Sequence, residues 1–350
     1  AQAGRKYRMD TERHLIERIA RALSFNTRGR GARYEASFGL RLGIGDDAAI
    51  FAPSGKEQVV TCDAFIEGVH FFGDSSRNAT PADAVGYKAL VRATSDLAAM
   101  GATPRYFLLT LALPRRLTGR WLDGLLGGMR RATRELKLEI AGGDTTQNDQ
   151  VALSLTVIGE IGAGRALTRS GARPGDLIYV SGPLGRAQLG LELIRLGLGG
   201  RKKLRVLLQP HLYPRIPIEL GRWLAAGRAA SAAMDISDGL STDLARLCAA
   251  SGVGARVWAE RIPRVVIPTE LYKRMPRPQS DALAMALHGG DDYGLLFTVP
   301  PVRAGVLAAA PGFRALAQIG EITRARKIVL EREDGSARAL ESLGWDSFRR

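Results

Sequence analysis

Acidic residues recur along this chain in short glycine-bearing stretches, and this recurrence limits its possible chemistry more than any other feature. The first stretch is LGIGDDAAIF, residues 42–51, in which Asp46 and Asp47 follow two glycines. Adjacent carboxylates repel each other and burial increases the repulsion, so a cation between them is expected. All-oxygen ligand sets of this kind suit Mg²⁺ or Ca²⁺. A single such stretch is equally typical of a solvated turn between two strands.

The theme returns five more times, which favours the metal interpretation. The later stretches are Asp63 after VVTC, SD at 95–96, GGD at 142–144, DISDG at 235–239 and GGDD at 289–292. Asp96 falls in the last turn of a predicted helix, where the macrodipole disfavours a carboxylate by a few tenths to about 1 kcal/mol unless it has a partner. Together the six stretches predict a site for several metal ions and phosphate groups at the junction of two domains.

Charge and composition exclude several other classes. The net charge of +15 is carried by scattered arginines, thicker at residues 1–34 and 201–205, without an interleaved aromatic platform, so nucleic-acid binding is disfavoured. No apolar run approaches the ~18 residues of a membrane span, and the charged N-terminus lacks a signal-peptide core, so a cytoplasmic protein without membrane contact is expected. Cys62 and Cys248 are far apart, which excludes an evident zinc or disulfide framework.

Hydrophobic periodicity predicts alternating helices and strands in two domains of one 350-residue chain. Asp63 is expected at the carboxyl end of its strand, residues 199–205 as a solvated linker and residues 211–217 as turns. Ser241 or Thr242 is expected to cap the helix that follows DISDG. Helices are predicted at 10–25, 81–101, 119–137 and after 239, and strands at 40–44, 48–52, 59–62, 106–114, 138–141, 151–161 and 177–180.

The ordered motifs resemble those of the thiamine-monophosphate kinase family, in the superfamily of the aminoimidazole ribonucleotide synthetases. The resemblance rests on GIGDDAA, YKALVRATSDLAAMGATP, GGDTT, ALTRSGARPGD, DISDGL and GGDDY, and it covers nearly the whole chain. It implies an α/β (α+β) fold of two domains. Residues 1–160 would form the ATP- and Mg²⁺-binding domain, whose mixed sheet pairs with a second copy into a homodimer barrel. Residues 161–350 would form an α/β domain that closes the active site.

The resemblance also implies a role for each matching residue. Asp47, Asp235 and Arg169 would be catalytic. The nucleotide would be contacted by Gly143, Asp144, Arg169 and Ser237, and thiamine monophosphate by His70, Asp291 and Trp345. For His70 and Trp345 a purely structural role is the open alternative. The Mg²⁺ ligands would be Asp47, Thr61, Cys62, Asp63, Asp96, Asp144, Asp235 and Asp238.

Three positions depart from the family pattern. Asp291 and Gly294 stand where the family usually has glutamates, and Cys62 stands where it has Thr or Ser. The shorter Asp291 puts a direct substrate contact in doubt, whereas Cys62 is harmless if its backbone carbonyl is the ligand. Selenophosphate synthetases and carbamoyl-dehydrating maturation factors are the related alternatives, but their reactive N- or C-terminal cysteines are missing from this chain.

The expected reaction is transfer of the γ-phosphate of ATP to thiamine monophosphate. The attacking phosphate oxygen is already ionised near neutral pH, because the second pKa of a phosphate monoester is about 6. No general base is then needed, which agrees with the absence of a recognisable Ser/His/Asp or Cys/His set among the four histidines. The chain must instead neutralise two polyanions and align them for direct in-line transfer, without a phosphoenzyme.

Overall fold

The computed structural model describes residues 12–23, 40–42, 50–51, 55–275 and 281–348. Asp46 and Asp47 lie outside the described residues. The chain forms two compact units, the first from residues 1–94 and 104–160, the second from residues 95–103 and 161–350. Helix α2 (Ala82–Ala99) passes from one unit into the other between Thr94 and Ser95. The predicted α/β class is confirmed.

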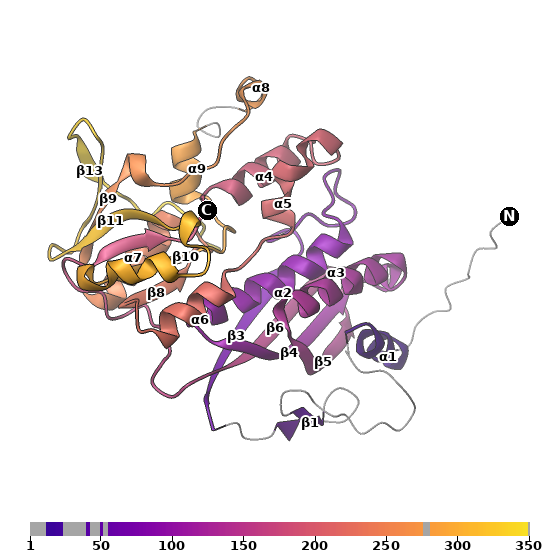
Figure 1. The fold of residues 1–350 in the computed structure, drawn as a ribbon. Coiled ribbons are helices and arrows are strands. Elements are labelled where there is room, and N and C mark those ends of the chain that lie inside the picture. Colours follow the sequence, from indigo (N-terminus) through magenta and orange to yellow (C-terminus); the bar gives the residue numbers. More distant parts are fainter. Residues whose placement is uncertain (1–11, 24–39, 43–49, 52–54, 276–280, 349–350) are drawn as a thin grey trace. The chain divides into compact units, whose positions relative to one another are not determined.

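The first unit is built on a four-stranded sheet in the order β3-β6-β4-β5. Helices α2 and α3 (Arg120–Leu136) lie on one face of this sheet, and α1 (Glu12–Leu23) contacts α3 and β5 (Figure 1). A separate pair of short strands, β1 (Leu40–Leu42) and β2 (Ile50–Phe51), is antiparallel. The sheet strands are β3 (Glu57–Ile66), β4 (Thr103–Leu113), β5 (Glu139–Gln147) and β6 (Ala152–Ile161), and η1 (Arg115–Leu117) follows β4.

Strand β3 differs from its prediction. Asp63 was expected at the carboxyl end of a strand that stops at Cys62, but β3 continues to Ile66, so Asp63 lies inside it. The continuation is built from AFI, whose Phe65 is fully buried, so hydrophobic burial carries the strand past the carboxylate.

The second unit is built on a seven-stranded sheet in the order β13-β12-β9-β11-β7-β10-β8, mostly antiparallel, with β12 parallel to β9. Helix α7 (Leu240–Ser251) packs on β8, β9 and α9 (Ala282–His288), and α4 (Arg186–Arg195) packs on α5 (Arg205–Leu212) (Figure 1). The strands are β7 (Leu177–Val180), β8 (Ala232–Asp235), β9 (Gly254–Trp258), β10 (Leu295–Val299), β11 (Ala317–Thr323), β12 (Ile328–Glu331) and β13 (Ala337–Ala339).

The apolar core of this unit joins the central strands to α7 and α9. Cys248 belongs to it, and burial raises the pKa of its thiol to about 12. The remaining elements are α6 (Ile218–Ala226), α8 (Thr269–Tyr272), η2 (Lys202–Leu204), η3 (Ala259–Arg261), η4 (Pro301–Ala309) and η5 (Phe313–Ala315). Across the residues that the structure describes, every helix is too short or too polar to span a bilayer.

The region between α4 and α6 was predicted as a solvated linker at 199–205 followed by turns at 211–217. Residues 213–217 lie outside helices as predicted, but the helix before them was missed. Residues 202–212 are helical instead, as η2 and α5, although Pro210 lies inside α5. Leu208, His211 and Leu212 are buried there against neighbouring elements, including α4. Tertiary burial has overridden the local proline and charge signals.

Helices α2 and α3 approach each other closely where each carries a glycine. A Cβ atom on Gly128 would lie 1.8 Å from the carbonyl oxygen of Asp83, and one on Gly86 would lie 2.0 Å from that of Leu125. A side chain at either glycine would therefore force the two helices apart, because the atoms it meets belong to the backbone. The adjacent Gly127 has open space around its Cα.

We predict that Gly128→Ala destabilises the protein although alanine favours helices. The clash outweighs the propensity gain, so the free energy of unfolding should fall by about 1–3 kcal/mol, as for an overpacked core. Gly127→Ala is the matched control and should be neutral or more stable by up to about 1 kcal/mol. Urea unfolding of both variants measures the difference. Equal stabilities of the two variants would contradict the close helix approach.

Candidate functional site

Two carboxylates meet in the second unit where α2 ends beside β8. Asp235 is the last residue of β8, and its side chain is almost completely buried, with 3% exposure. Ser95, also buried, donates from its Oγ to Oδ2 of Asp235 over 2.8 Å. The neighbouring Asp96 is half-buried, and its negative charge raises the pKa of the same carboxyl group. The structure therefore unites the 95–96 and 235–239 stretches, as predicted.

The surroundings of Asp235 disfavour its charged form. Burial raises the pKa of its carboxyl to about 7, and the negative charges of Asp96 and Asp243 act in the same direction. The Ser95 hydrogen bond and the positive charge of Arg169 oppose them. A cation at this point would relieve the repulsion, which agrees with the predicted role of Asp96 and Asp235 as metal ligands.

Arg169 is held near Asp235 by backbone pairing. The amide of Leu167 donates to the carbonyl of Met100 over 3.0 Å, and the amide of Ala233 donates to the carbonyl of Thr168 over 2.9 Å. The segment is thus tied both to the end of α2 and to β8. Arg169 is exposed, and its charge lowers the pKa of Asp235. An exposed guanidinium near buried carboxylates suits binding of a phosphate group.

The DISDG and GGDD stretches pair through their backbones. Ile236 donates to the carbonyl of Gly294 over 2.8 Å, and Tyr293 donates to the carbonyl of Ile236 over 2.8 Å. The amide of Asp291 donates to the carbonyl of Ser237 over 2.8 Å, and the half-buried Ser237 thereby lies at the point where the two loops cross. The structure brings these two acidic loops together as one rigid substructure.

Asp291 is fixed in an unusual backbone conformation. Its φ is 69° and that of Tyr293 is 50°, in the left-handed region that non-glycine residues rarely adopt. The hydroxyl of Tyr293 donates to Oδ1 of Asp291 over 2.6 Å, and Nδ1 of the buried His211 lies 3.8 Å from Oδ2. Strained residues of this kind cluster at ligand sites. Neither Tyr293 nor His211 was identified from the sequence.

Asp292 has a different role from its neighbour. Its carboxylate accepts the amides of Gly185 over 2.6 Å and of Ala187 over 3.1 Å, at the N-terminus of α4. Burial raises the pKa of Asp292 to about 7, although these backbone hydrogen bonds act against the rise. It therefore anchors α4 to the GGDD loop rather than facing a ligand.

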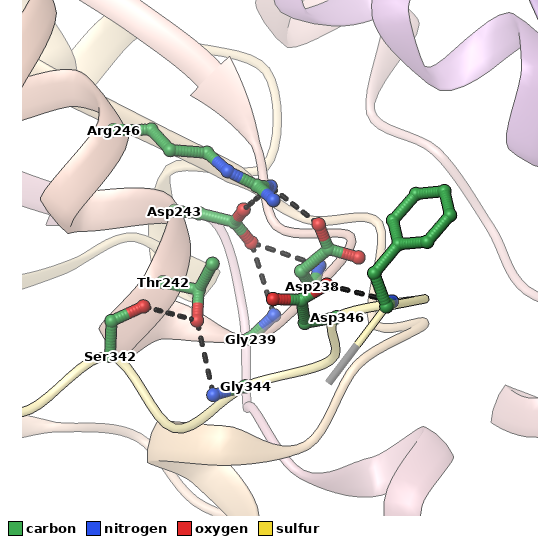
Figure 2. A network of polar contacts seen from close by, with 9 residues as sticks. Asp238, Gly239, Thr242, Asp243, Arg246, Ser342, Gly344 and Asp346 are labelled. Carbon is green, nitrogen blue, oxygen red and sulfur yellow. Dashed lines mark hydrogen bonds and ion pairs between the residues drawn. The ribbon is translucent and has the colours of Figure 1, made fainter. Parts of the chain in front are cut away.

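Asp238 is held by a clamp of two side chains from α7 (Figure 2). Arg246 donates to Oδ2 of Asp238 and also to Oδ1 of Asp243, the latter over 3.0 Å. The second oxygen of Asp243 accepts the amides of Asp238 and Gly239 over 3.0 and 3.1 Å. Burial raises the pKa of Asp243 to about 7, and the charge of Asp238 adds to the rise, whereas Arg246 opposes it.

The predicted cap of α7 by Ser241 or Thr242 is wrong. The N-cap residue is Gly239, which has no capping side chain, and Asp243 within the helix accepts the amides of Asp238 and Gly239 that precede it. Ser241 instead lies 2.9 Å from Nδ1 of His288, as a pair that the sequence did not reveal. The hydroxyl of Ser241 is completely buried, so this pair serves the core and not nucleophilic chemistry.

In the first unit, Asp63 and Asp144 lie on the two edge strands of the sheet. Oδ2 of Asp63 accepts from Nε of Arg92 on α2 over 3.2 Å, so Asp63 faces the helices. Asp144 is exposed and in register with the exposed Thr110, on the face opposite to the helices. One copy of this unit therefore does not bring the two carboxylates together.

Three further predicted residues have defined structural surroundings in the first unit. Nδ1 of His70 accepts the amide of Ile66 over 3.0 Å, so the neutral ring carries its proton on Nε2, and the ring stacks on Phe65. Sγ of the exposed Cys62 lies 3.4 Å from Oγ of Ser154. Gly143 has a φ of 155°, and a Cβ there would meet the carbonyl oxygen of Leu109 at 1.9 Å.

The predicted ligands are divided between the units. Thr61, which is half-buried, joins Cys62, Asp63 and Asp144 in the first, whereas Asp96, Asp235 and Asp238 belong to the second. Within the described parts of the chain, no three His, Cys, Asp or Glu side chains gather in a metal-binding group. The role of Ser95 was missed because its partner Asp235 is 140 positions away in the sequence. Asp243 and Arg246 were missed although their partners are nearby, and the DISDG stretch was the signal that pointed toward them.

Comparison with known protein families covers most of the chain. Residues 45–161 match the model of the AIR synthase related protein, N-terminal domain, and residues 173–333 match that of its C-terminal domain. Among curated relatives, the thiamine-monophosphate kinase of Salmonella typhimurium is 37% identical over 88% of this chain and 92% of the relative. That of Aquifex aeolicus is 32% identical over 87% and 92%.

Solved structures agree with these relatives. The thiamine-monophosphate kinase of Stenotrophomonas maltophilia superposes with a TM-score of 0.73 and 34% identity, covering 93% of this chain and 96% of that one. AaThiL complexed with AMPPCP and TMP gives a TM-score of 0.72 and 32% identity, covering 87% and 92%. The hydrogenase maturation protein HypE of E. coli, with a TM-score of 0.71 and 20% identity, shares the fold.

We predict that Asp235→Asn stabilises the metal-free protein at pH 8. The folded protein binds the Asp235 proton more tightly than the unfolded chain does, because the pKa rises from 3.8 to about 7 on folding. Stability is therefore lost as pH rises between these values, by at most a few kcal/mol at about 1.4 kcal/mol per pKa unit. The asparagine variant should escape this loss.

Urea unfolding in EDTA at pH 5 and pH 8 tests the prediction. The advantage of Asp235→Asn over the wild type should be larger at pH 8 than at pH 5. The exposed Asp149 provides the control variant Asp149→Asn, which should follow the wild type at both pH values. If the stability of Asp235→Asn changes with pH as much as that of the wild type does, the buried charge of Asp235 is not the cause of the pH dependence.

Proposed function

This chain belongs to the thiamine-monophosphate kinase family, and we propose that it transfers the γ-phosphoryl group of ATP to thiamine monophosphate, giving thiamine diphosphate and ADP. The relatives named for this activity are 31–37% identical over most of the chain. AaThiL, which has the same fold, was crystallised with AMPPCP, an ATP analogue, and TMP. The pair formed by the buried carboxylate of Asp235 and the half-buried one of Asp96, beside Arg169, is the observation in this chain that carries the proposal.

The donor set fits Mg²⁺. Burial and the charges of Asp96 and Asp243 raise the pKa of Asp235 in spite of Arg169, and carboxylate oxygens are the ligands that Mg²⁺ prefers. Arg246 holds one oxygen of Asp238, so a metal ion would take the other. When bound, the ions would supply neutralisation of the phosphate charge. The residues proposed to hold them are Asp47, Thr61, Cys62, Asp63, Asp96, Asp144, Asp235 and Asp238, with Cys62 acting through its backbone carbonyl.

The remaining residues divide between the two substrates. Arg169 and Ser237 lie beside the carboxylates and would contact the ATP phosphates, as would Gly143 and Asp144. His70 would donate through Nε2, since its Nδ1 already accepts from Ile66. The family glutamate is shortened to Asp291 here, and Tyr293 and His211 hold this carboxylate in place. Trp345, 48% exposed, would contact the aromatic rings of thiamine monophosphate.

The chemistry requires charge neutralisation and alignment rather than proton abstraction. The acceptor phosphate is ionised near neutral pH, so its oxygen attacks the γ-phosphorus directly and the bond to the β-phosphate oxygen breaks. Arg169 compensates charge on the transferring group, and the aspartates do so through the cations they hold. The transfer is in line and forms no phosphoenzyme.

A homodimer is part of the proposal. On the sheet face opposite to the helices, Val60 is 60% exposed on the edge strand β3. The partly buried Leu108 on β4 and Ile158 on β6 pack against Tyr106 of β4, which makes the centre of the sheet apolar. A second copy of the sheet would cover it and form the predicted barrel. Such apolar faces normally pack against another layer.

We predict stoichiometric turnover with purified protein, ATP, MgCl₂ and thiamine monophosphate. Chromatography should show one thiamine diphosphate per ADP, and EDTA should abolish both products. Asp235→Asn should lower kcat by about two orders of magnitude or more, because it removes an electrostatic group at the transferring phosphate. Asp149→Asn should turn over like the wild type. If ADP forms without thiamine diphosphate, the phosphate acceptor is a molecule other than thiamine monophosphate.

We also predict that Val60→Lys weakens the dimer. A lysine on the apolar sheet face must lose its hydration when two copies meet, so the Kd of the dimer should rise at least about tenfold. Analytical ultracentrifugation over a range of concentrations measures the change. Val266→Lys alters a valine of the second unit that is 83% exposed and should leave the dimer intact. A monomeric wild type at micromolar concentration would refute the dimer.

A further inference from the structure

The segment Ser342–Trp345, here called the C-terminal tail, is fastened to the first turn of α7 and to Asp238 before it by four hydrogen bonds. Figure 2 shows the two bonds that involve Thr242. Oγ1 of Thr242 lies 2.9 Å from Oγ of Ser342 and accepts the amide of Gly344 over 3.0 Å. The amide of Leu343 donates to Oγ of Ser241 over 3.4 Å. The amide of Trp345 donates to the carbonyl of Asp238 over 2.8 Å.

Gly344 makes this approach possible. A Cβ atom at residue 344 would lie 2.1 Å from the carbonyl oxygen of Asp238 and 2.7 Å from Oγ1 of Thr242. A carbonyl in the DISDG turn cannot move aside, because the adjacent amides of Asp238 and Gly239 are held by Asp243. Any side chain at residue 344 would therefore displace the tail.

The backbone of the C-terminal tail is held by hydrogen bonds, whereas the indole ring of Trp345 remains accessible. Trp345 is 48% exposed although its amide is bonded to Asp238, and the neighbouring Leu343 is also exposed. A tail held for stability alone would bury its largest apolar side chain, which contributes the most hydrophobic free energy. An exposed indole on an anchored backbone is instead preorganised to receive a flat ligand.

Asp238 connects the tail to the acidic site. Its carbonyl accepts from Trp345, whereas its carboxylate is paired with Arg246. The Arg246–Asp243 clamp thus orients Asp238, which has two roles. Its carboxylate would lie on the cation side of the site, and its carbonyl holds the backbone of Trp345, whose indole would lie on the thiamine side. Displacement of the tail would change where the indole lies without removing any group that touches the phosphates.

We propose that Thr242 and Gly344 are positioning residues for thiamine monophosphate, which set Trp345 against the thiamine ring by docking the C-terminal tail on the DISDG turn. The inference rests on the proposed function. It assigns to the Thr242 hydroxyl and to the missing side chain of Gly344 a role in selecting the acceptor substrate, not ATP. Trp is the side chain that best faces a cationic aromatic ring such as thiazolium.

The test is steady-state kinetics of Thr242→Val and Gly344→Ala with both substrates varied. The KM for thiamine monophosphate should rise about fivefold or more, the effect of roughly one lost hydrogen bond, whereas the KM for ATP should change less than about twofold. Thermal unfolding checks that both variants remain folded. Trp345→Ala should raise the same KM.

Two matched controls separate positioning from general destabilisation. Gly305→Ala adds a methyl group where no atom lies within 4 Å. Thr298→Val removes a buried hydroxyl that lies 2.7 Å from Oγ of Ser231, at the end of β10 away from Asp235. Both should keep the wild-type KM for thiamine monophosphate.

A double-mutant cycle gives the decisive result. If Gly344 acts through Trp345, Gly344→Ala should have little further effect on the KM in a Trp345→Ala background. Additive effects, or equal changes in both KM values, would overturn the inference and leave the kinase proposal standing. A wild type that neither binds thiamine monophosphate in calorimetry nor phosphorylates it would overturn both.

Discussion

The burial of Asp235 beside Asp96 is the interaction on which the rest of the site depends. A carboxylate at the end of a core strand loses its hydration, and a second carboxylate nearby raises the cost of its charge further, which is why its pKa is about 7. Ser95 and Arg169 offset only part of this cost. The arrangement is unfavourable for the chain alone. In the proposed function a bound cation would offset this cost, which would link folding to metal binding.

Around this pair, the protein uses backbone hydrogen bonds to hold acidic loops that would otherwise separate. The DISDG and GGDD stretches pair residue by residue, and the strained Asp291 and Tyr293 are kept in place by that pairing. Each neighbouring aspartate then takes a distinct part. Asp292 anchors α4 and Asp243 anchors the turn of α7, whereas Asp235 accepts a hydrogen bond from Ser95 and Asp291 accepts one from Tyr293. These negatively charged loops stay together because some of their carboxylates accept hydrogen bonds from backbone amides of the protein.

The sequence predicted the alternating fold and most of its elements, because the burial pattern in a strand such as β6 is local and periodic. It failed at α5, where Pro210 and a basic run concealed a helix that packs on α4. It also placed Asp63 at a strand end, since nothing local shows that Phe65 is buried. Both errors have the same origin: the deciding contact is made by a residue distant along the chain.

By itself, the sequence determined which residues are candidates for the chemistry. The aspartates in their glycine-bearing stretches and Arg169 can be identified because residue type and spacing are local properties. Only the tertiary structure decided which of them act together. It joined Ser95 to Asp235 across 140 positions, turned Asp238 toward Arg246 and Asp292 toward α4, and brought the C-terminal tail to Thr242. Charge, burial and hydrogen-bond partners depend on neighbours in space, and those neighbours exist only once the chain has folded.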